Sequence, residues 1–519
     1  MKKEKNLQSK KKRRICGLET EYGLVFIGSE NSDANVVKNF DDESPGTAEK
    51  ELFENLNKLA GINNSRRFVG ESGRSDDFFS RNGGRIYLDM GKHPETSTPE
   101  CASPKEAVLY DKAAERLLEK ALEKTNGKFP AGQKLFLFKN NTHRENDTFG
   151  CHENYGYSAK TDFNKGIVPV LILFLVTRQI FCGSGKIWGN RFEISQRAKF
   201  IRDTVSSGTI DDNWQGGNSR PLINNRTQES RNDSVGALAN SRLWQRLHLI
   251  LGDSNMSEYA AWLKLGTTAL VLRMIEDGFI KWQIETADYA PWVYRRISRD
   301  LTCRKKIKVI FSKAEGKLAT IRWLSPVEIQ ELYLKEAKKF LKKRKILFCA
   351  GNFREFKEIA REWGSVLEKL KTNPMLLKQE IDWVIKKNLM DEYQKKKNLK
   401  RHTAALKMID LQYHNVDRGQ GLYYFLEKEG LARRIFCDEE INKAMTEPPS
   451  DTRAKWRGLI VGFCEDNGIS YKANWTKFYF PVVSARLIRP LEIKCFDPFH
   501  APARLSETLA RDLKRRKQK

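Results

Sequence analysis

The sequence contains no apolar stretch long enough to cross a bilayer. Its longest apolar run, 167–176, is interrupted by Pro169, whereas a membrane-spanning helix needs about 20 apolar residues. The basic N-terminus leads into segment 15–26, which contains two glutamates and therefore does not resemble a signal peptide. We expect a soluble cytoplasmic protein with no membrane partner.

The sequence also lacks the cysteine spacings of disulfide-rich and zinc-binding proteins. Its nine cysteines include no C-x-x-C pair and no cluster with histidine at zinc-ligand spacing. An odd number of cysteines in a chain of 519 residues argues against a disulfide framework. We expect reduced cysteines, as in a cytoplasmic protein.

Acidic residues are few relative to basic ones. Lys and Arg number 93 against 66 Asp and Glu, which gives a net charge of +27. Such an excess favours an acidic partner, which could be nucleic acid, an anionic membrane or an acidic protein. Part of the excess lies in four basic runs, at 10–14, 338–345, 395–401 and 514–519. Each run alone is more simply explained as a solvated helix face or tail, so charge does not name the partner.

Common catalytic motifs are missing as well. There is no G-x-S-x-G and no H-E-x-x-H. Segment 183–186 resembles the end of a phosphate-binding loop, but Ile187 follows where Ser or Thr is required. Cys151 and His152 are neighbours, yet neighbours in a strand face opposite sides. If the protein is a nucleotide enzyme, carboxylates on a sheet must perform the chemistry.

The pattern along the chain predicts an α+β fold. Strand-like segments at 85–89, 134–139 and 246–252 are interspersed with helical ones, without a regular βαβ rhythm. Helices are expected at 48–60 and after Ser103, where Pro104 and Glu106 complete a capping box. Further predictions are a disordered basic arm at 1–14, polar loops at 29–46 and 206–231, a mainly helical region at 325–435, and a small C-terminal domain at 436–519.

Segment 85–89 is the most informative local feature. In a strand, Ile86 and Leu88 would enter the core, while Arg85, Tyr87 and Asp89 would share the other face. A cation, a phenol and a carboxylate on one sheet face could hold phosphate, metal and a reacting proton. A polar solvent-exposed face explains this segment alone equally well.

Other carboxylates lie close to this strand in the sequence. Glu19 and Glu21 point the same way if their segment is extended. After Asp89 follow His93, Glu95, Thr98 and Glu100, and together these residues offer the oxygen ligands that magnesium prefers. A surface salt bridge is the simpler reading of any single carboxylate, whereas the set favours a magnesium site.

A series of segments along the chain resembles one known protein family. It begins with Arg13-Arg14-Ile15-Cys16-Gly17-Leu18-Glu19-Thr20-Glu21-Tyr22-Gly23 and with Asn82-Gly83-Gly84-Arg85-Ile86-Tyr87-Leu88-Asp89. Further segments follow in order at 93–95, 99–101, 138–141, 150–155, 195–197, 247–258, 380–387 and 448–458. In these segments the chain resembles the Pup ligases and their deamidase/depupylase relatives. Because the matches run from about 13 to 500, the resemblance rests on far more than one motif.

This resemblance implies a glutamine-synthetase-like fold, in which a curved antiparallel sheet is backed by helices. It implies a carboxylate-amine ligase catalytic domain at 15–435 and the small C-terminal domain. By position in the motifs, it assigns metal binding to Glu19, Tyr87 and Glu95, ATP contacts to Arg85, Thr98 and Trp475, and the role of catalytic base to Asp89.

The implied activity requires ATP and magnesium. An acidic, disordered Pup-like modifier would be joined through the γ-carboxylate of its C-terminal glutamate, activated as a γ-glutamyl phosphate, to a lysine of a protein substrate. This attachment would mark the substrate for proteasomal degradation. Details at Gly73-Arg74-Ser75 and Asp497-Pro498-Phe499 favour the ligase branch, whereas Thr98–Cys101 and Asp451–Ala454 are closer to depupylases.

Several alternatives stay open beside the favoured ligase reading. These are a deamidase/depupylase acting on the same modifier, a small-molecule γ-glutamyl ligase, and a basic scaffold on an inactive fold. We expect no specific nucleic-acid partner. The segment Asn225-Arg226-Thr227-Gln228-Glu229-Ser230 departs from the acidic, His-containing stretch that the family usually has there.

Overall fold

The computed structural model describes the chain with gaps. It leaves out residues 1–13, 29–36, 39–45, 60–76, 90, 143–146, 209–218, 226–243, 314–318, 344–351, 400–402, 482–488 and 517–519. Much of the predicted basic arm, the loop after Gly28 and the departing segment at 227–230 therefore lie outside the described residues. Arg14 is described and is 4% exposed, so the arm prediction was wrong at this residue, which belongs to the fold.

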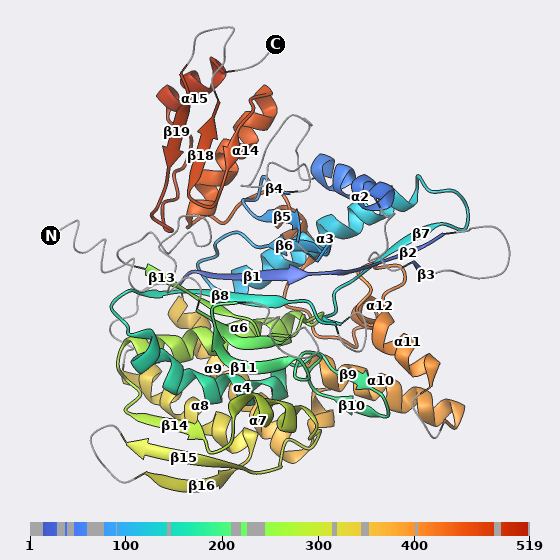
Figure 1. Ribbon diagram of the computed structural model, residues 1–519, viewed down its shortest axis with the longest axis vertical. Helices are drawn as coiled ribbons and strands as arrows, with labels where there is room; N and C mark the ends of the chain where they lie inside the picture. The colour runs from blue at the N-terminus through green and yellow to red at the C-terminus, as the bar shows by residue number, and fades with distance from the viewer. Residues whose placement is uncertain are drawn as a thin grey trace.

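An eight-stranded sheet forms the centre of the molecule (Figure 1). Its spatial order is β11, β12, β13, β8, β1, β6, β5, β4. The strands are β1 (Cys16–Glu21), β4 (Asp77–Phe79), β5 (Arg85–Leu88), β6 (Pro94–Ser97), β8 (Cys151–Ser158), β11 (Ile201–Ser206), β12 (Arg220–Asn224) and β13 (Trp244–Leu249). Neighbours are antiparallel except β11 and β12, which are parallel. The predicted α+β class with a largely antiparallel sheet is confirmed.

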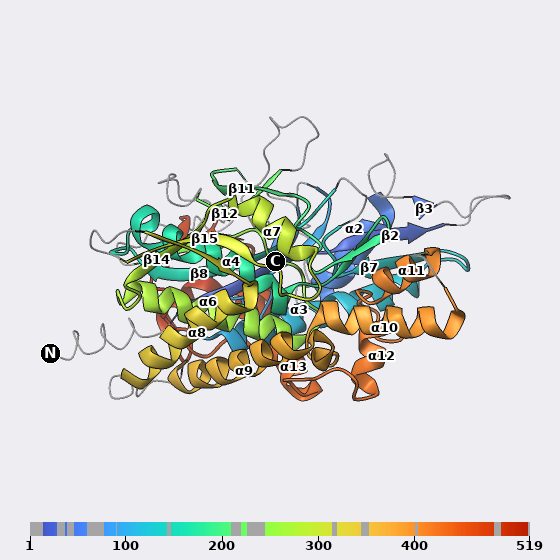
Figure 2. The ribbon, with the colours of Figure 1, turned by 90° about the horizontal axis from the view of Figure 1, so that it is seen from below.

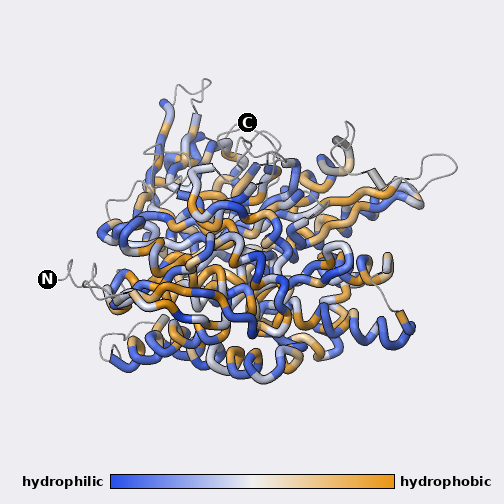
Figure 3. Tube along the Cα trace, turned by 60° about the horizontal axis from the view of Figure 1, so that its bottom comes forward, coloured by the Kyte–Doolittle hydropathy of each residue, from blue (hydrophilic) through white to orange (hydrophobic). Residues whose placement is uncertain are grey.

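Two helical layers cover one face of this sheet (Figures 1 and 2). Helices α3 (Pro104–Asn126) and α6 (Glu258–Glu276) contact β1, β6 and β8, and α4 (Val168–Cys182), α8 (Pro326–Lys343) and α9 (Asn352–Thr372) pack behind them. Apolar stretches, orange in Figure 3, gather in this interior. The other face of the sheet is left for polar side chains.

The start of α3 follows the predicted capping pattern with one shift. The Ser103 hydroxyl accepts a hydrogen bond from the Glu106 amide at 3.2 Å. The Glu106 carboxylate reaches the amide of Ala102, at 2.7 Å, one residue before the cap. The N-terminus of α3 is therefore capped by Ser103 as predicted, with the second hydrogen bond of the capping box shifted by one residue.

Helix α4 continues a π-helical turn, Phe163–Ile167, and together they span Phe163–Cys182. By length and hydropathy alone this helix could cross a membrane, so the prediction that no segment is long enough was wrong. The predicted run ended at 176, whereas the helix continues for six residues beyond it. In the fold, 72% of the most apolar 18-residue stretch of this helix is buried. The helix packs against α6, α7 (Ala290–Ser298) and α8, as a core helix does.

The predicted polar loop at 206–231 is only partly correct. Strand β12 lies within it, and its Leu222 and Ile223 are fully buried. These two apolar residues, set in a polar surrounding, provide enough burial for a short strand beside β13. The helical prediction for 325–435 is confirmed by α8, α9, the 3-10 turn η2 (Pro374–Leu377), α10 (Asp382–Lys397), α11 (Ala404–Gln412) and α12 (Leu422–Lys428).

Four smaller sheets and the remaining helices complete the described structure. The smaller sheets contain β2 (Gly23–Ile27) with β3 (Val37–Lys38) and β7 (Lys134–Phe138); β9 (Lys186–Trp188) with β10 (Arg191–Glu193); β14 (Trp282–Thr286), β15 (Ile307–Lys313) and β16 (Thr320–Leu324); and β17 (Lys472–Ala473), β18 (Lys477–Phe480) and β19 (Leu491–Lys494). The other helices are α2 (Gly46–Leu59), α13 (Asp438–Ala444), α14 (Arg453–Asn467) and α15 (Glu507–Lys514).

The segment after 436 forms its own small sheet, β17 to β19, with α14 and α15 beside it (Figure 1). Helix α13, however, packs on α3 of the main body, and apolar residues of both parts belong to one hydrophobic cluster. A separate C-terminal domain beginning at 436 stays a prediction.

Candidate active site

Three carboxylates from three strand segments meet at the open face of the central sheet. Glu21 ends β1, Glu95 lies in β6 and pairs directly with Glu21, and Asp89 follows β5. One carboxylate oxygen from each lies within 4.8 Å of the others. Glu19 and Glu21 face the same side of β1, because the strand alternates buried and half-buried positions from Cys16 to Glu21. The strand-face prediction for β1 is confirmed.

The electrostatics of this cluster favour a bound cation. Burial, reinforced by the charges of Glu21 and Glu19, raises the pKa of Glu95 well above its ordinary value. Burial and the charge of Glu21 likewise raise the pKa of Asp89 to about 6. Carboxylates held so close repel one another unless a cation or a proton lies between them. The donor set consists of oxygen atoms, as magnesium requires.

Arg85 and Tyr87 lie beside the cluster on the same face as Asp89. The Arg85 guanidinium lies 4.4 Å from the centre of the Tyr87 ring. It also donates two hydrogen bonds to Asp77, at 2.7 and 2.8 Å, so its orientation is fixed by the neighbouring strand β4. Tyr87 hydrogen-bonds Glu95, and burial together with the charge of Glu95 raises the pKa of the phenol well above its usual range. The predicted shared face of Arg85, Tyr87 and Asp89 is confirmed.

Glu19 lies in an adjoining cluster with two histidines and an arginine. One of its oxygens is 3.5 Å from Nδ1 of His152 and 3.5 Å from Nε2 of His248, and the other is 3.5 Å from Arg246. Burial raises the pKa of Glu19, but these three neighbours outweigh burial and hold the pKa well below its ordinary value. Burial and the nearby Arg246 lower the pKa of His248 to about 3, so this imidazole is neutral.

The hydrogen bond from Arg246 determines the tautomer of His248 beside Glu19. Arg246 donates to Nδ1 of His248 at 2.7 Å, which places the proton of the neutral ring on Nε2, facing Glu19. The Arg246 cation already lies beside Glu19. The Glu21, Asp89 and Glu95 cluster is therefore the better cation site of the two.

A pocket runs along β1 next to these clusters. Thr98, Trp475, Glu19 and Arg246 all line it. Residues 15–18 of the same chain segment line it as well. Thr98 is held in place because its hydroxyl accepts a hydrogen bond from the Leu18 amide at 3.0 Å. The structure thus brings Trp475, which the strand-face argument could not reach, to the same pocket as Thr98.

Glu100 does not join the carboxylate cluster as the magnesium hypothesis allowed. It binds Arg453 and Arg457 of α14. Burial raises the pKa of Glu100, but the two guanidinium groups outweigh burial and hold the pKa at about 2. Glu100 therefore ties the C-terminal segment to the sheet.

Two weaker motifs resolve into structural roles. Lys186, from the segment that resembles a phosphate loop, lies 3.3 Å from Asp410. Cys151 is buried on the helix side of β8 and Lys264 donates to its sulfur at 3.8 Å, while His152 faces the site. Neither motif supplies a reacting group.

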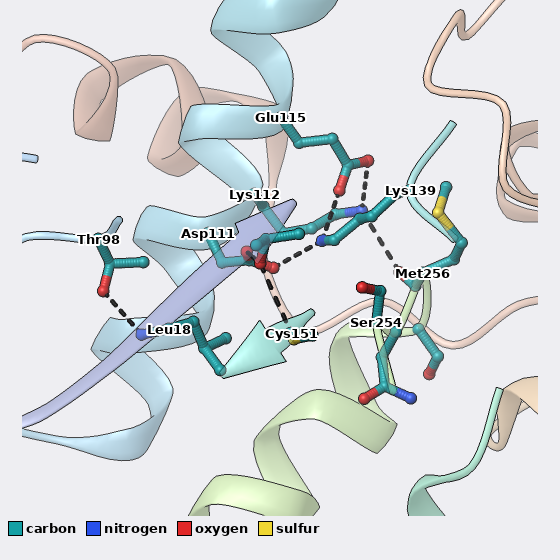
Figure 4. A network of polar contacts seen from close by, with 12 residues as sticks. Leu18, Thr98, Asp111, Lys112, Glu115, Lys139, Cys151, Ser254 and Met256 are labelled. Carbon is teal, nitrogen blue, oxygen red and sulfur yellow. Dashed lines mark hydrogen bonds and ion pairs between the residues drawn. The ribbon is translucent and has the colours of Figure 1, made fainter. Parts of the chain in front are cut away.

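Behind β1, buried charges support the strand from the helix side (Figure 4). The Thr20 hydroxyl donates to Asp111 at 2.9 Å, and Lys139 lies 2.6 Å from Asp111 and 2.8 Å from Glu115. Lys112 adds a second cation, 2.9 Å from Glu115. Because Thr20 lies between Glu19 and Glu21, this network fixes the side to which both glutamates point.

Sequence reasoning missed His152, His248 and Arg246, and it noted Glu21 without assigning it a role. The signal was available in the strands that carry them. Arg246 and His248 are two residues apart in β13, the same spacing that drew attention to Arg85 and Tyr87. Their partner Glu19 could not be found in this way, because the pairing of β13 with β8 and of β8 with β1 joins segments far apart in sequence.

Comparison with known proteins gives a consistent result. Residues 14–479 match the family model for Pup-ligase protein. The Pup--protein ligase of Kineococcus radiotolerans is 36% identical over 500 residues, covering 94% of this chain and 97% of the relative. The Pup--protein ligase of a Nocardioides species is also 36% identical, with the same shares covered.

Solved structures agree with the sequence relatives. The crystal structure of the complex between the prokaryotic ubiquitin-like protein Pup and its ligase PafA matches with a TM-score of 0.78 and 29% identity, covering 97% of this chain and 92% of that chain. The structure of the Pup ligase PafA in complex with ADP matches with a TM-score of 0.71 and 27% identity, covering 95% and 98%. The chain therefore belongs to the Pup-ligase family.

Proposed function

We propose that this protein is an ATP- and magnesium-dependent ligase that joins the C-terminal glutamate of a Pup-like modifier to lysines of other proteins. The observation that carries the proposal is the continuity of the site. The pocket lined by Thr98 and Trp475 reaches Glu19, which adjoins the cluster of Glu21, Asp89 and Glu95. The family relatives named as Pup ligases, and the relative solved with ADP, support the same activity.

Magnesium fits the carboxylate cluster. By the geometry of the cluster, Glu95 and Glu21 would hold it. The motif positions imply Glu19, Tyr87 and Glu95 as its ligands, and Tyr87 and Glu19 would stand next to the cluster. The raised pKa values of Glu95 and Asp89 support this assignment, because an added cation would relieve the repulsion that raises them. When bound, ATP would supply the phosphoryl group that activates the modifier's carboxylate, and magnesium would offset the negative charge on that group.

Each side chain of the site has a task in this reaction. Asp89 would accept a proton from the attacking lysine, because only the neutral amine is nucleophilic. Arg85, fixed by Asp77, would offset negative charge on the transferring phosphoryl group. Thr98 and Trp475 would position the nucleotide along β1.

The proposed partner is an acidic modifier protein, as the relative solved with Pup supports. The net charge of +27 would steer such a partner electrostatically, and this steering weakens as salt screens it. Protein lysines complete the substrate set. We expect this activity in the cytoplasm, where the buried free cysteines of the described residues would stay reduced.

The test is intact-protein mass spectrometry of a reaction with ATP, magnesium, a Glu-ended modifier and a lysine-bearing acceptor. We expect a new species at the summed mass less one water. The Asp89→Asn variant keeps the shape of the side chain but cannot take the proton, and we expect its rate to fall by at least about 100-fold.

Other products would identify the other activities. If the protein cleaves a preformed conjugate and forms no new one, its activity is that of a depupylase and not of a ligase. Ligation of free glutamate would point to a small-molecule enzyme, and absence of all turnover would support a scaffold. Equal rates for wild type and Asp89→Asn would remove Asp89 from the role of base.

A further inference from the structure

Arg457 of α14 makes a set of contacts that the proposed reaction does not use. Its guanidinium is fully buried and donates to the carbonyl of Gly83 at 2.9 Å and to the carbonyl of Trp475 at 2.9 Å. Its remaining amino group binds the Glu100 carboxylate. Three different parts of the chain therefore meet at one side chain: the turn before β5, the end of the pocket wall, and the loop that carries Trp475.

The same guanidinium also lies over two aromatic rings. Its central carbon is 4.7 Å from the centre of the Trp475 ring and 4.9 Å from that of Phe79. The two rings contact each other edge to face at 5.2 Å. A planar cation over an aromatic face is attracted to it, and the attraction grows when water is excluded. Arg457 thus fixes both the backbone and the ring of Trp475.

We infer that Arg457 is a positioning residue that sets Trp475 for the nucleotide. The inference rests on the proposed function, because it assigns the pocket of Thr98 and Trp475 to ATP. Trp475 lies in the short loop between β17 and β18, outside the central sheet. Its place in the pocket therefore depends on contacts between the C-terminal segment and the central sheet. Arg457 provides such a contact, because it binds Trp475 directly and also binds Gly83 and Glu100.

Arg453, one helical turn earlier, provides a matched control. It donates to the same Glu100 carboxylate, at 2.7 Å and 3.0 Å, and is equally buried. It also donates a hydrogen bond to the carbonyl of Cys495, at 3.0 Å, directly after β19. Lysine at either position would keep a charge opposite Glu100 but lose the planar fork. Arg457→Lys therefore removes the hydrogen bonds to the carbonyls of Gly83 and Trp475 and the contacts with the Trp475 and Phe79 rings. Arg453→Lys instead removes the hydrogen bond to the carbonyl of Cys495.

The experiment measures ADP binding by calorimetry together with KM for ATP, kcat and the thermal midpoint. We expect Arg457→Lys to weaken ADP binding and raise KM for ATP by about tenfold, with kcat changed less than about threefold. We expect Arg453→Lys to lower the thermal midpoint about as much as Arg457→Lys does. We expect Arg453→Lys to change ADP affinity by less than about twofold. Trp475→Ala, which leaves the buried ion pairs in place, should reproduce the loss of ADP affinity.

The outcomes separate this inference from the proposed function. Wild-type protein that binds no ADP overturns the proposed function and the inference with it. If wild type binds ADP but Arg457→Lys and Arg453→Lys lose affinity equally, Arg457 has only a structural role and the inference is wrong. Normal ADP binding by Trp475→Ala would also overturn it, even if the Arg457 variant does not fold.

Discussion

At the scale of single residues, Gly17 shows how little free space the pocket wall has. A Cβ atom at this position would lie 3.2 Å from the Thr98 hydroxyl, which is tighter than ordinary contacts. That hydroxyl accepts the hydrogen bond from Leu18 and lines the pocket. A side chain at 17 would therefore displace Thr98 and narrow the pocket in the same step.

We predict that Gly17→Val weakens ADP binding by about tenfold or more while the protein stays folded. The cost of overpacking one site is about 1–3 kcal/mol, which a chain of this size tolerates. Calorimetry and thermal unfolding measure the two effects. Gly127→Ala is the control, since a Cβ there meets only carbonyl oxygens at 3.5 and 3.7 Å. Unchanged ADP affinity in Gly17→Val would show that β1 does not line the nucleotide site.

At the scale of elements, the site depends on the contact of β1 with α3. Thr20 points into the helix layer and is bound by Asp111, so its neighbours Glu19 and Glu21 point to the open face. Lys139, directly after β7, balances the charges of Asp111 and Glu115 and is 1% exposed. Removal of one partner from such a buried group leaves uncompensated charge, which costs roughly 3–5 kcal/mol.

We predict that Lys139→Met lowers the free energy of unfolding by roughly 3–5 kcal/mol, because Asp111 and Glu115 lose their shared cation. Urea denaturation checks this. Lys128→Met is the matched control, since Lys128 pairs with Glu51 but its side chain is 50% exposed, and such pairs contribute about 1 kcal/mol or less. Comparable losses in both variants would mean that the network does not hold the strand.

At the scale of the whole molecule, Glu100 connects the central sheet to the C-terminal segment. Its pKa is held at about 2 by Arg457 and Arg453 despite the opposing effect of burial. A carboxyl group with an ordinary pKa near 4.3 when unfolded therefore stabilises the fold above that pH, and the contribution is lost as pH falls from about 4.5 to 2. The full difference amounts to roughly 3 kcal/mol as an upper limit.

We predict that the free energy of unfolding falls over this acid range and that Glu100→Gln flattens the slope, because the variant has no carboxyl group to titrate there. Chemical denaturation at pH 2.5 to 6 measures the slope. Glu492→Gln, at a side chain 41% exposed in β19, should leave the slope nearly unchanged. A Glu100→Gln variant with the wild-type slope would mean that other acids govern acid unfolding.

The sequence alone determined the local elements and the faces of the site strands. A period of two along β1 and β5 follows from backbone geometry, so the shared faces of Glu19 with Glu21 and of Arg85 with Tyr87 could be derived before any pairing was known. The cap of α3 was equally local, because Ser103 and Glu106 act within one turn. The matching segments, which extend over most of the chain, also identified the family, and the comparisons confirm it.

Only the tertiary structure decided which side chains meet. Register between β1 and β6 placed Glu95 opposite Glu21, and the pairing of β8 and β13 brought His152 and His248 to Glu19. Glu100 and Arg457 are 357 residues apart, and no local pattern predicts that the two charges neutralise each other. Local geometry is set by a few neighbouring dihedrals, whereas these contacts depend on burial summed over the whole chain, which a period in the sequence does not record.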